Sequence, residues 1–208
     1  MVHRTLALLL CGLIGATTAC SGAEPVADES DRSDDALSAT GATCADADGA
    51  VFFHGLQGLG RELAGEGLCV PRLDVFSIDN PFVDAPSATV VGGYSAGRLP
   101  LLGRLASGRG REATAVMLDP SYSDGRRFNG RTGPSIVADW LAGDRARRFV
   151  FVYSRQSTGW VEYLSLKEGP VASQVRVCPM NGAHGDLPRL VTRRLFTDVD
   201  AWLAERCR

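Results

Sequence analysis

Short apolar runs alternate with amphipathic stretches along most of this 208-residue chain, and this rhythm constrains its fold more than any other feature. Continuous apolar runs predict strands buried on both faces, which are typical of a parallel sheet covered by helices. We expect six strands, over residues 50–54, 73–78, 89–93, 114–118, 148–153 and 174–178. We expect helices over residues 56–66, 96–107, 134–142 and 187–205. The pattern therefore predicts an α/β domain whose mostly parallel sheet carries helices on both faces.

The first 43 residues differ in composition from this domain. A positive start at His3 and Arg4, an apolar run over residues 6–14 and small residues after it are typical of a secretory signal peptide, expected over residues 1–19. The run is too short to span a bilayer as a mature helix. Residues 20–43 carry six acidic residues against one basic residue and no apolar period, so we expect an acidic, disordered tether. The folded domain is then expected over residues 44–208.

The signal ends in Ala16-Thr17-Thr18-Ala19-Cys20. A cysteine directly after small residues resembles the bacterial lipobox, in which the cysteine is lipidated and becomes the mature N-terminus. The resemblance implies an exported protein of the bacterial cell envelope, attached to a membrane through a lipid anchor at Cys20. The alternative is ordinary signal-peptidase cleavage, which would leave Cys20 free and the protein secreted.

The charge and the cysteines of the domain limit the kinds of partner and cofactor that it can have. Residues 44–208 carry 20 basic and 18 acidic residues, which is too close to neutral to predict a nucleic-acid partner. The domain contains four cysteines: Cys44, Cys69, Cys178 and Cys207. In an exported protein an even number indicates two disulfides, with three possible connectivities. The cysteine spacing fits no zinc pattern and the only histidines of the domain are His54 and His184, so we expect no metal and no cofactor.

Three polar residues follow the ends of predicted strands, in the chain order serine, aspartate, histidine. Ser95 lies in Gly93-Tyr94-Ser95-Ala96-Gly97, which fits the G-x-S-x-G turn that exposes a nucleophilic serine between a strand and a helix. Asp119 follows the fourth strand, and His184 follows the sixth. The carboxyl ends of parallel strands lie at one edge of the sheet, where ligands bind. We therefore expect Ser95 as nucleophile, His184 as general base and Asp119 as the acid that orients it.

The first strand ends in His54-Gly55-Leu56-Gln57-Gly58. A turn of this H-G-x-x-G form after the first strand of a hydrolase sheet contributes a backbone N–H to an oxyanion hole, and the residue after the nucleophile contributes the other. The predicted donors are the N–H groups of Leu56 and Ala96. We expect His54 to hold this turn and not to transfer protons.

With these motifs in place, residues 44–208 resemble a minimal α/β-hydrolase of the bacterial lipase and cutinase kind. The resemblance implies a three-layer α/β-hydrolase sandwich without a cap domain, and hydrolysis of small-molecule or lipid carboxylic esters by a monomer. The fold implies the disulfide Cys44–Cys69, which leaves Cys178–Cys207 as the second. The alternatives are acyl transfer or thioester cleavage by the same three residues, or a non-catalytic surface lipoprotein that keeps the fold.

The position of the predicted acid, Asp119, differs from that in most of this family, which carries the acid after the strand that corresponds to residues 148–153. The chain reads Ser154-Arg155-Gln156-Ser157 there, whereas Leu118-Asp119-Pro120 is similar to the pancreatic-type lipases, which place the acid one strand earlier. Glu162 and Asp124 are the alternatives, and Asp186 lies too close in sequence to His184 to be favoured.

Two further expectations concern the surroundings of Ser95. Pro100 lacks an N–H and follows Ser95 closely, so we expect the next helix to begin late or to bend. Arg98, directly after the motif, is bulkier than the small residue often found there. The candidates for a partly apolar substrate pocket are Leu56, Tyr94, Tyr122, Phe128 and Trp160.

Overall fold

The computed structural model describes residue 44 and residues 49–64, 67–80, 82–120, 127–157, 161–191 and 193–207. The expected signal peptide, Cys20 and the acidic tether lie outside the described residues, as do Tyr122, Asp124 and Trp160. Within the described part of the chain, no helix is both long and apolar enough to cross a membrane.

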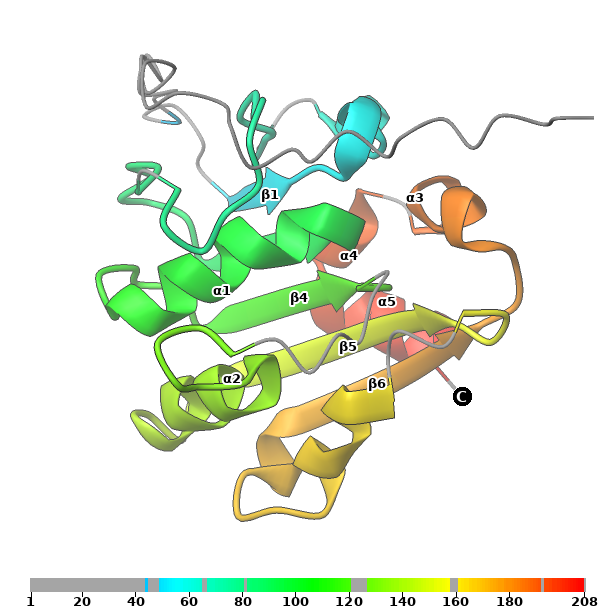
Figure 1. Cartoon of the computed structure of the whole chain (residues 1–208). Coiled ribbons are helices and arrows are strands. Elements are labelled where there is room, and N and C mark those ends of the chain that lie inside the picture. The colour runs from blue at the N-terminus through cyan, green and yellow to red at the C-terminus, as the bar shows by residue number, and fades with distance from the viewer. Residues whose placement is uncertain are drawn as a thin grey trace, which may run out of the picture. The chain divides into compact units, whose positions relative to one another are not determined.

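The expected parallel sheet is confirmed (Figure 1). Its strands, in chain order, are β1 Ala50–Phe53, β2 Leu68–Cys69, β3 Val90–Tyr94, β4 Thr114–Leu118, β5 Arg148–Ser154 and β6 Val175–Met180. They are arranged β2-β1-β3-β4-β5-β6, and every neighbouring pair is parallel. All their carboxyl ends therefore lie at one edge, where the segments carrying Ser95, Asp119 and His184 begin.

The prediction of a strand over residues 73–78 is wrong. The edge strand is the two-residue β2, and residues 73–78 belong to the connection between β2 and β3. In this connection side chains bind backbone groups that a strand would use for its ladder. The N–H of Ser77 donates to Oδ1 of Asn80 at 2.6 Å, and Nδ2 of Asn80 donates to the carbonyl of Val75 at 3.0 Å. Local bonds of this kind compete with sheet formation.

Two predicted helices are confirmed: α1 over Arg98–Ser107 and α2 over Gly133–Ala142. A short 3₁₀ turn, η4 (Ser95–Gly97), precedes α1. Pro100 is thus the third residue of the α-helix, in the first turn, where proline is tolerated. The expectation that this helix begins late is confirmed.

The helix predicted over residues 56–66 is replaced by two 3₁₀ turns, η2 (Leu56–Gly58) and η3 (Arg61–Leu63). Gly58 and Gly60 adopt φ values of 77° and 95°, which interrupt a right-handed helix. Two further 3₁₀ segments, η5 (Val161–Lys167) and η6 (Ala172–Gln174), lie in the connection between β5 and β6.

The long helix predicted over residues 187–205 is divided into α3 (Leu187–Leu190), α4 (Arg194–Thr197) and α5 (Val199–Arg206). Asp198 has a non-helical φ of −146°, and its side chain accepts a hydrogen bond from the N–H of Ala201 at 3.0 Å. It therefore caps a new helix where the apolar periodicity alone predicted a continuous one.

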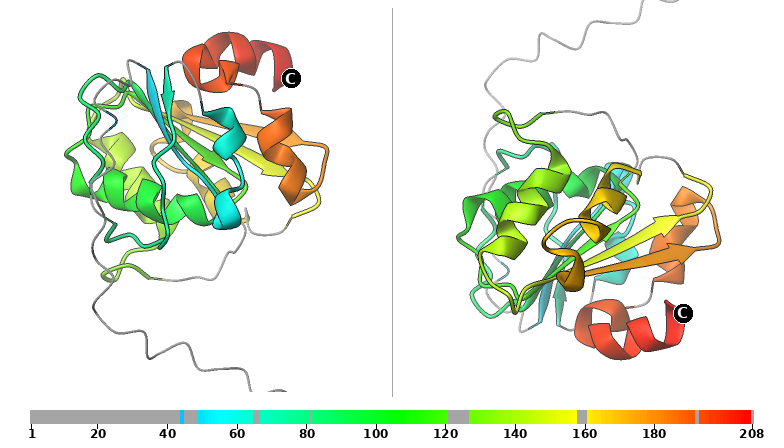
Figure 2. Two further views of the ribbon diagram at one scale, coloured as in Figure 1. Left: turned by 90° about the horizontal axis from the view of Figure 1, so that it is seen from above. Right: turned by 90° about the horizontal axis from the view of Figure 1, so that it is seen from below.

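Helices pack on both faces of the sheet (Figure 2). The side chains of successive strand residues point to opposite faces and belong to two different cores. Val51 and Phe53 of β1 belong to the core shared with α1, α2 and η5, whereas Ala50 and Phe52 belong to the core shared with the C-terminal helices. The largest fully buried side chains include Phe52, Tyr94, Phe149, Tyr163, Phe196 and Trp202.

Both disulfides have the predicted connectivity. Cys44 is joined to Cys69 of β2, and Cys178 of β6 is joined to Cys207 beyond α5, with Cα–Cα distances of 5.8 and 5.0 Å. Disulfides persist in oxidising compartments, so this pair of bonds fits an exported protein.

Candidate active site

Ser95 lies at the sharp turn between β3 and α1. Its φ is 53°, a left-handed conformation that is uncommon for a residue with a side chain. The flanking glycines are required sterically: a Cβ on Gly93 would lie 2.5 Å from the carbonyl oxygen of Gly97, and one on Gly97 would overlap the carbonyl oxygen of Phe53. The strand–turn–helix context that the G-x-S-x-G pattern needs is therefore present, with Ser95 at its apex.

Asp119 and His184 lie 65 residues apart in the sequence and are in direct contact. Asp119 directly follows β4, and its N–H donates to the carbonyl of Val152 on β5 at 2.7 Å. Its fully buried carboxylate accepts, through Oδ2, a hydrogen bond from Nδ1 of His184 at 2.7 Å. This bond fixes the histidine with its proton on Nδ1, so that Nε2 of the neutral ring is an acceptor. The pair has the geometry of a base and its orienting acid.

Tyr94 connects this pair to the serine turn. Its ring stacks on the imidazole of His184 with 5.0 Å between ring centroids and an interplanar angle of 25°, and its hydroxyl donates to the His184 carbonyl at 2.9 Å. Burial, assisted by the negative charge of Asp119, raises the pKa of Tyr94 to about 12, so the hydroxyl remains a donor at neutral pH. Because Tyr94 directly precedes Ser95, these contacts bring the imidazole to the turn that carries the serine.

Replacing Tyr94 with phenylalanine tests this connection. The variant loses the hydrogen bond to the His184 carbonyl but keeps the stacked ring, so we expect the free energy of unfolding to fall by about 1 kcal/mol. The measurement is urea unfolding followed by tryptophan fluorescence. An unchanged midpoint would show that this hydrogen bond contributes nothing to stability, and Tyr153→Phe provides a tyrosine control outside this contact.

The turn after β1 packs against the serine turn. A Cβ on Gly55 would lie 2.9 Å from the Tyr94 ring and 3.2 Å from Cβ of Ser95. Leu56 is the first residue of η2 and Ala96 is the second residue of η4, and N–H groups at such positions have no acceptor within their own turn. The two predicted oxyanion donors therefore lie on adjoining turns beside Ser95.

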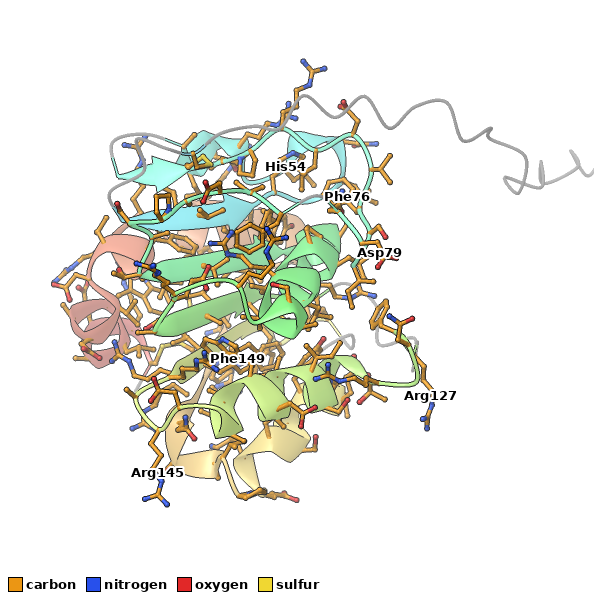
Figure 3. The ribbon with its side chains drawn as sticks, turned by 90° about the vertical axis from the view of Figure 1, so that its left-hand side faces the viewer. His54, Phe76, Asp79, Arg127, Arg145 and Phe149 are labelled. Carbon is orange, nitrogen blue, oxygen red and sulfur yellow. A yellow bond between two sulfur atoms is a disulfide. The ribbon has the colours of Figure 1, made fainter. Side chains whose placement is uncertain are left out.

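His54 holds the turn after β1, as expected. The side chain is buried, Nδ1 donates to the carbonyl of Gly55 at 2.6 Å, and Nε2 accepts from the N–H of Leu73 at 3.1 Å. Its ring also contacts Phe76 edge-on, with 5.4 Å between centroids (Figure 3). Burial lowers the pKa of His54, so the ring is neutral at pH 7 and both of its nitrogens are engaged in fixed bonds.

The alternative acids have other surroundings. Glu162 lies in η5, and it is Asp119 that contacts the histidine. Asp186 accepts a hydrogen bond from the N–H of Ala183 at 3.2 Å and so caps the turn that carries His184. Asp124 lies outside the described residues.

A pair of serines at the end of β5 was not predicted as part of the site. The N–H of Ser154 donates to Oδ1 of Asp119 at 3.2 Å, and the hydroxyl of Ser157 donates to the same oxygen. The signal in the sequence is their position, since residues 154–157 follow the strand next to the one that ends at Asp119.

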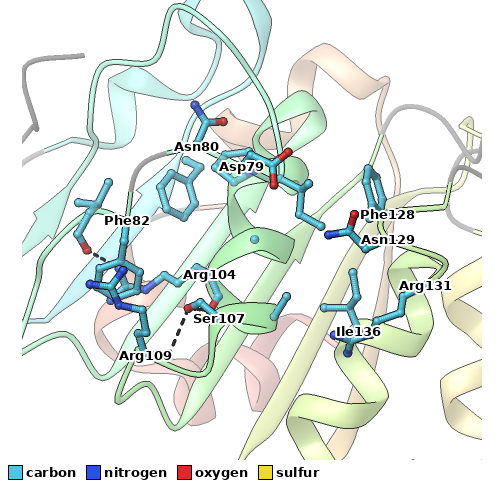
Figure 4. A pocket seen from close by; sticks show the side chains of 16 residues that line it. Asp79, Asn80, Phe82, Arg104, Ser107, Arg109, Phe128, Asn129, Arg131 and Ile136 are labelled. Carbon is cyan, nitrogen blue, oxygen red and sulfur yellow. Dashed lines mark hydrogen bonds between the residues drawn. The ribbon is translucent and has the colours of Figure 1, made fainter. Parts of the chain in front are cut away.

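Ser95 borders neither of two hollows found in the described part of the chain. A cavity of about 340 Å³ lies beside α1, between the 78–83 connection and the 128–131 turn (Figure 4). Phe128, expected to line the substrate pocket, borders this cavity, whereas Ser95, Asp119 and His184 do not. Large exposed apolar side chains instead lie on segments that leave the carboxyl ends of the strands: Leu56, Leu59, Val75, Val161 and Leu190.

Among the described residues, no group of three or more histidine, cysteine, aspartate or glutamate side chains could hold a metal ion. No protein-family model, curated protein or solved structure matches the chain.

Proposed function

We propose that the chain is an exported serine hydrolase that cleaves carboxylic esters, built as a three-layer α/β-hydrolase sandwich. The observation that carries this proposal is the hydrogen bond from His184 to the buried Asp119, in a pair that Tyr94 connects to the strained turn at Ser95. A buried carboxylate, a histidine of fixed tautomer and a serine at a left-handed turn are the parts that acyl transfer needs.

In the proposed reaction, Nε2 of His184 takes the proton of the Ser95 hydroxyl as Oγ attacks the ester carbonyl. The carbonyl π pair moves to oxygen, and the N–H groups of Leu56 and Ala96 stabilise the negative charge that forms there. Collapse expels the alcohol, which receives the proton from His184, and leaves an ester between the acyl group and Ser95. Water, deprotonated by His184, then cleaves this ester and restores the serine. Asp119 stabilises the imidazolium at both stages without taking its proton.

The substrates we propose are small-molecule or lipid esters with an apolar acyl or alcohol group. Leu56, Leu59 and Leu190 are each more than one third exposed, and all three lie on segments adjoining Ser95 or His184. Apolar surface at this edge favours binding of an apolar group next to the serine. A lipid anchor at Cys20 followed by an acidic tether would hold the monomeric domain near a membrane.

A fluorophosphonate probe tests the proposal directly. We expect the folded protein to form one covalent adduct, located at Ser95 by peptide mass spectrometry, and we expect Ser95→Ala and heat-denatured protein to form none. Absence of an adduct in folded wild-type protein would contradict the hydrolase proposal and favour a non-catalytic lipoprotein. A panel of p-nitrophenyl esters of increasing acyl length, with and without an alcohol or thiol acceptor, then separates hydrolysis from acyl transfer.

A further inference from the structure

The carboxylate of Asp119 has three hydrogen-bond donors around it in the described structure. Oδ2 accepts from Nδ1 of His184, and Oδ1 accepts from the N–H of Ser154 and from the hydroxyl of Ser157. Asp119 is fully buried, so its carboxylate depends on donors from the surrounding protein. Ser157 thus contributes the one side-chain donor, besides His184, that the described hydrogen bonds give to this carboxylate.

We propose that Ser157 is a positioning residue, whose hydroxyl fixes the Asp119 carboxylate in the rotation that presents Oδ2 to His184. The proposal rests on the hydrolase function proposed above. The terminal torsion of an aspartate is broad and nearly two-fold, so packing alone defines it weakly. Two donors on Oδ1 hold the plane of the group, and bonds to a charged oxygen are the stronger kind.

The turn that carries Ser157 is also attached to the histidine loop. The N–H of Ser157 donates to the Ser154 carbonyl at 3.1 Å, and the N–H of Arg155 donates to Met180 at the end of β6 at 3.0 Å. The hydroxyl of Ser154 donates to the carbonyl of Gly182, two residues before His184. The turn that follows β5 therefore binds both partners. Ser157 binds the carboxylate of Asp119, and Ser154 binds the loop that carries His184.

This arrangement explains how an acid at the end of β4 can serve a histidine that follows β6. The strand order places β5 between them. A carboxylate at the end of β4 must reach across the end of β5, and the serines at that end provide donors that steady it. The hydroxyl of Ser157 acts on the reaction only through Asp119.

The experiment compares Ser157→Ala, Ser157→Thr and Ser157→Val in the full-length protein. Threonine and valine have the same shape and differ by the hydroxyl, so this pair decides the matter even if the alanine variant does not fold. Ser165→Ala is the matched control, because its hydroxyl donates to a carbonyl within η5, at Glu162, on an exposed surface. Two quantities are measured: kcat and KM for a p-nitrophenyl ester, and the downfield proton resonance of His184 Nδ1–H, assigned by its loss in His184→Gln.

We expect Ser157→Ala and Ser157→Val to lower kcat by about 10- to 100-fold with KM nearly unchanged, since one hydrogen bond to a charged group is lost. The His184 Nδ1–H resonance should broaden or move upfield in both variants, and Ser157→Thr and Ser165→Ala should keep wild-type values. A resonance that is the same in the valine and threonine variants would overturn the positioning role. If the resonance depends on the hydroxyl in this way but the wild-type protein forms no adduct at Ser95, the hydrolase function is overturned. The positioning role of Ser157 then stands.

Discussion

We expect Asp119→Asn to lower kcat for ester hydrolysis by about 10⁴-fold. Asparagine has nearly the shape of aspartate, and its carbonyl oxygen can still accept from the Ser154 N–H and the Ser157 hydroxyl. Its amide group would then face Nδ1 of His184 as a donor where the native oxygen is an acceptor. The imidazole must respond by moving its proton to Nε2, and Nε2 can then no longer take the proton of Ser95.

The measurement is the steady-state rate with a p-nitrophenyl ester, together with thermal unfolding to show that the variant is folded. Asp186→Asn is the matched control, because Asp186 caps the turn of His184 and does not contact the imidazole through any described bond. We expect this control to stay within about threefold of wild type, as for a local cap worth about 1 kcal/mol. Activity near the wild-type level in Asp119→Asn would move the acid to Glu162 or Asp124, and Glu162→Gln and Asp124→Asn would then show the loss.

The sequence predicted the central strands well because their burial on both faces demands continuous apolar runs. The four interior strands of the sheet, β1, β3, β4 and β5, lie within one residue of their predicted bounds. The errors occur where long-range contacts override the local pattern. The 73–78 segment has an apolar, strand-like composition, yet the N–H of Leu73 donates to the buried His54. Likewise, the periodicity of residues 187–205 does not reveal that Asp198 begins a new helix.

The candidate site divides in a similar way. Ser95, Asp119 and His184 could be predicted because residues at strand ends converge in any parallel sheet. The structure brings Asp119 and His184 together, and their catalytic roles remain predictions. The contacts of Tyr94 and Ser157 could not be predicted, because they depend on how the loops after β5 and β6 meet. Such loop geometry is set by tertiary hydrogen bonds that leave no periodic signal.

The largest expected effect on stability concerns a buried ion pair beside α1. Arg104 of α1 and Glu112, which precedes β4, are bonded to each other with side chains 3% and 1% exposed. Nη1 of Arg104 also donates to the carbonyl of Val83, and its guanidinium lies 4.4 Å from the centre of the Phe82 ring (Figure 4). The pair therefore joins three segments: the connection before β3, α1, and the start of β4.

Glu112→Ala should lower the free energy of unfolding by about 3–5 kcal/mol, because it leaves the Arg104 cation buried without a counter-charge. The double variant Arg104→Met with Glu112→Ala should recover part of this loss, since no charge is then left unpaired. The measurement is urea unfolding with linear extrapolation to water. A single variant that matches the double variant would show that the lost contacts, and not the stranded charge, determine the cost.

An exposed ion pair of the same residue types gives the matched control. Arg194 and Glu205 are bonded at 2.7 Å with side chains 52% and 48% exposed. Water solvates either partner when the other is removed, so Glu205→Ala should cost at most about 1 kcal/mol. The two glutamates differ in burial, and Glu205 also lies 3.4 Å from Arg206, so comparison of their effects tests the contribution of desolvation. A loss of similar size at both positions would mean that Arg104 reaches water when Glu112 is absent. The three segments joined by this ion pair would then separate more easily than their burial implies.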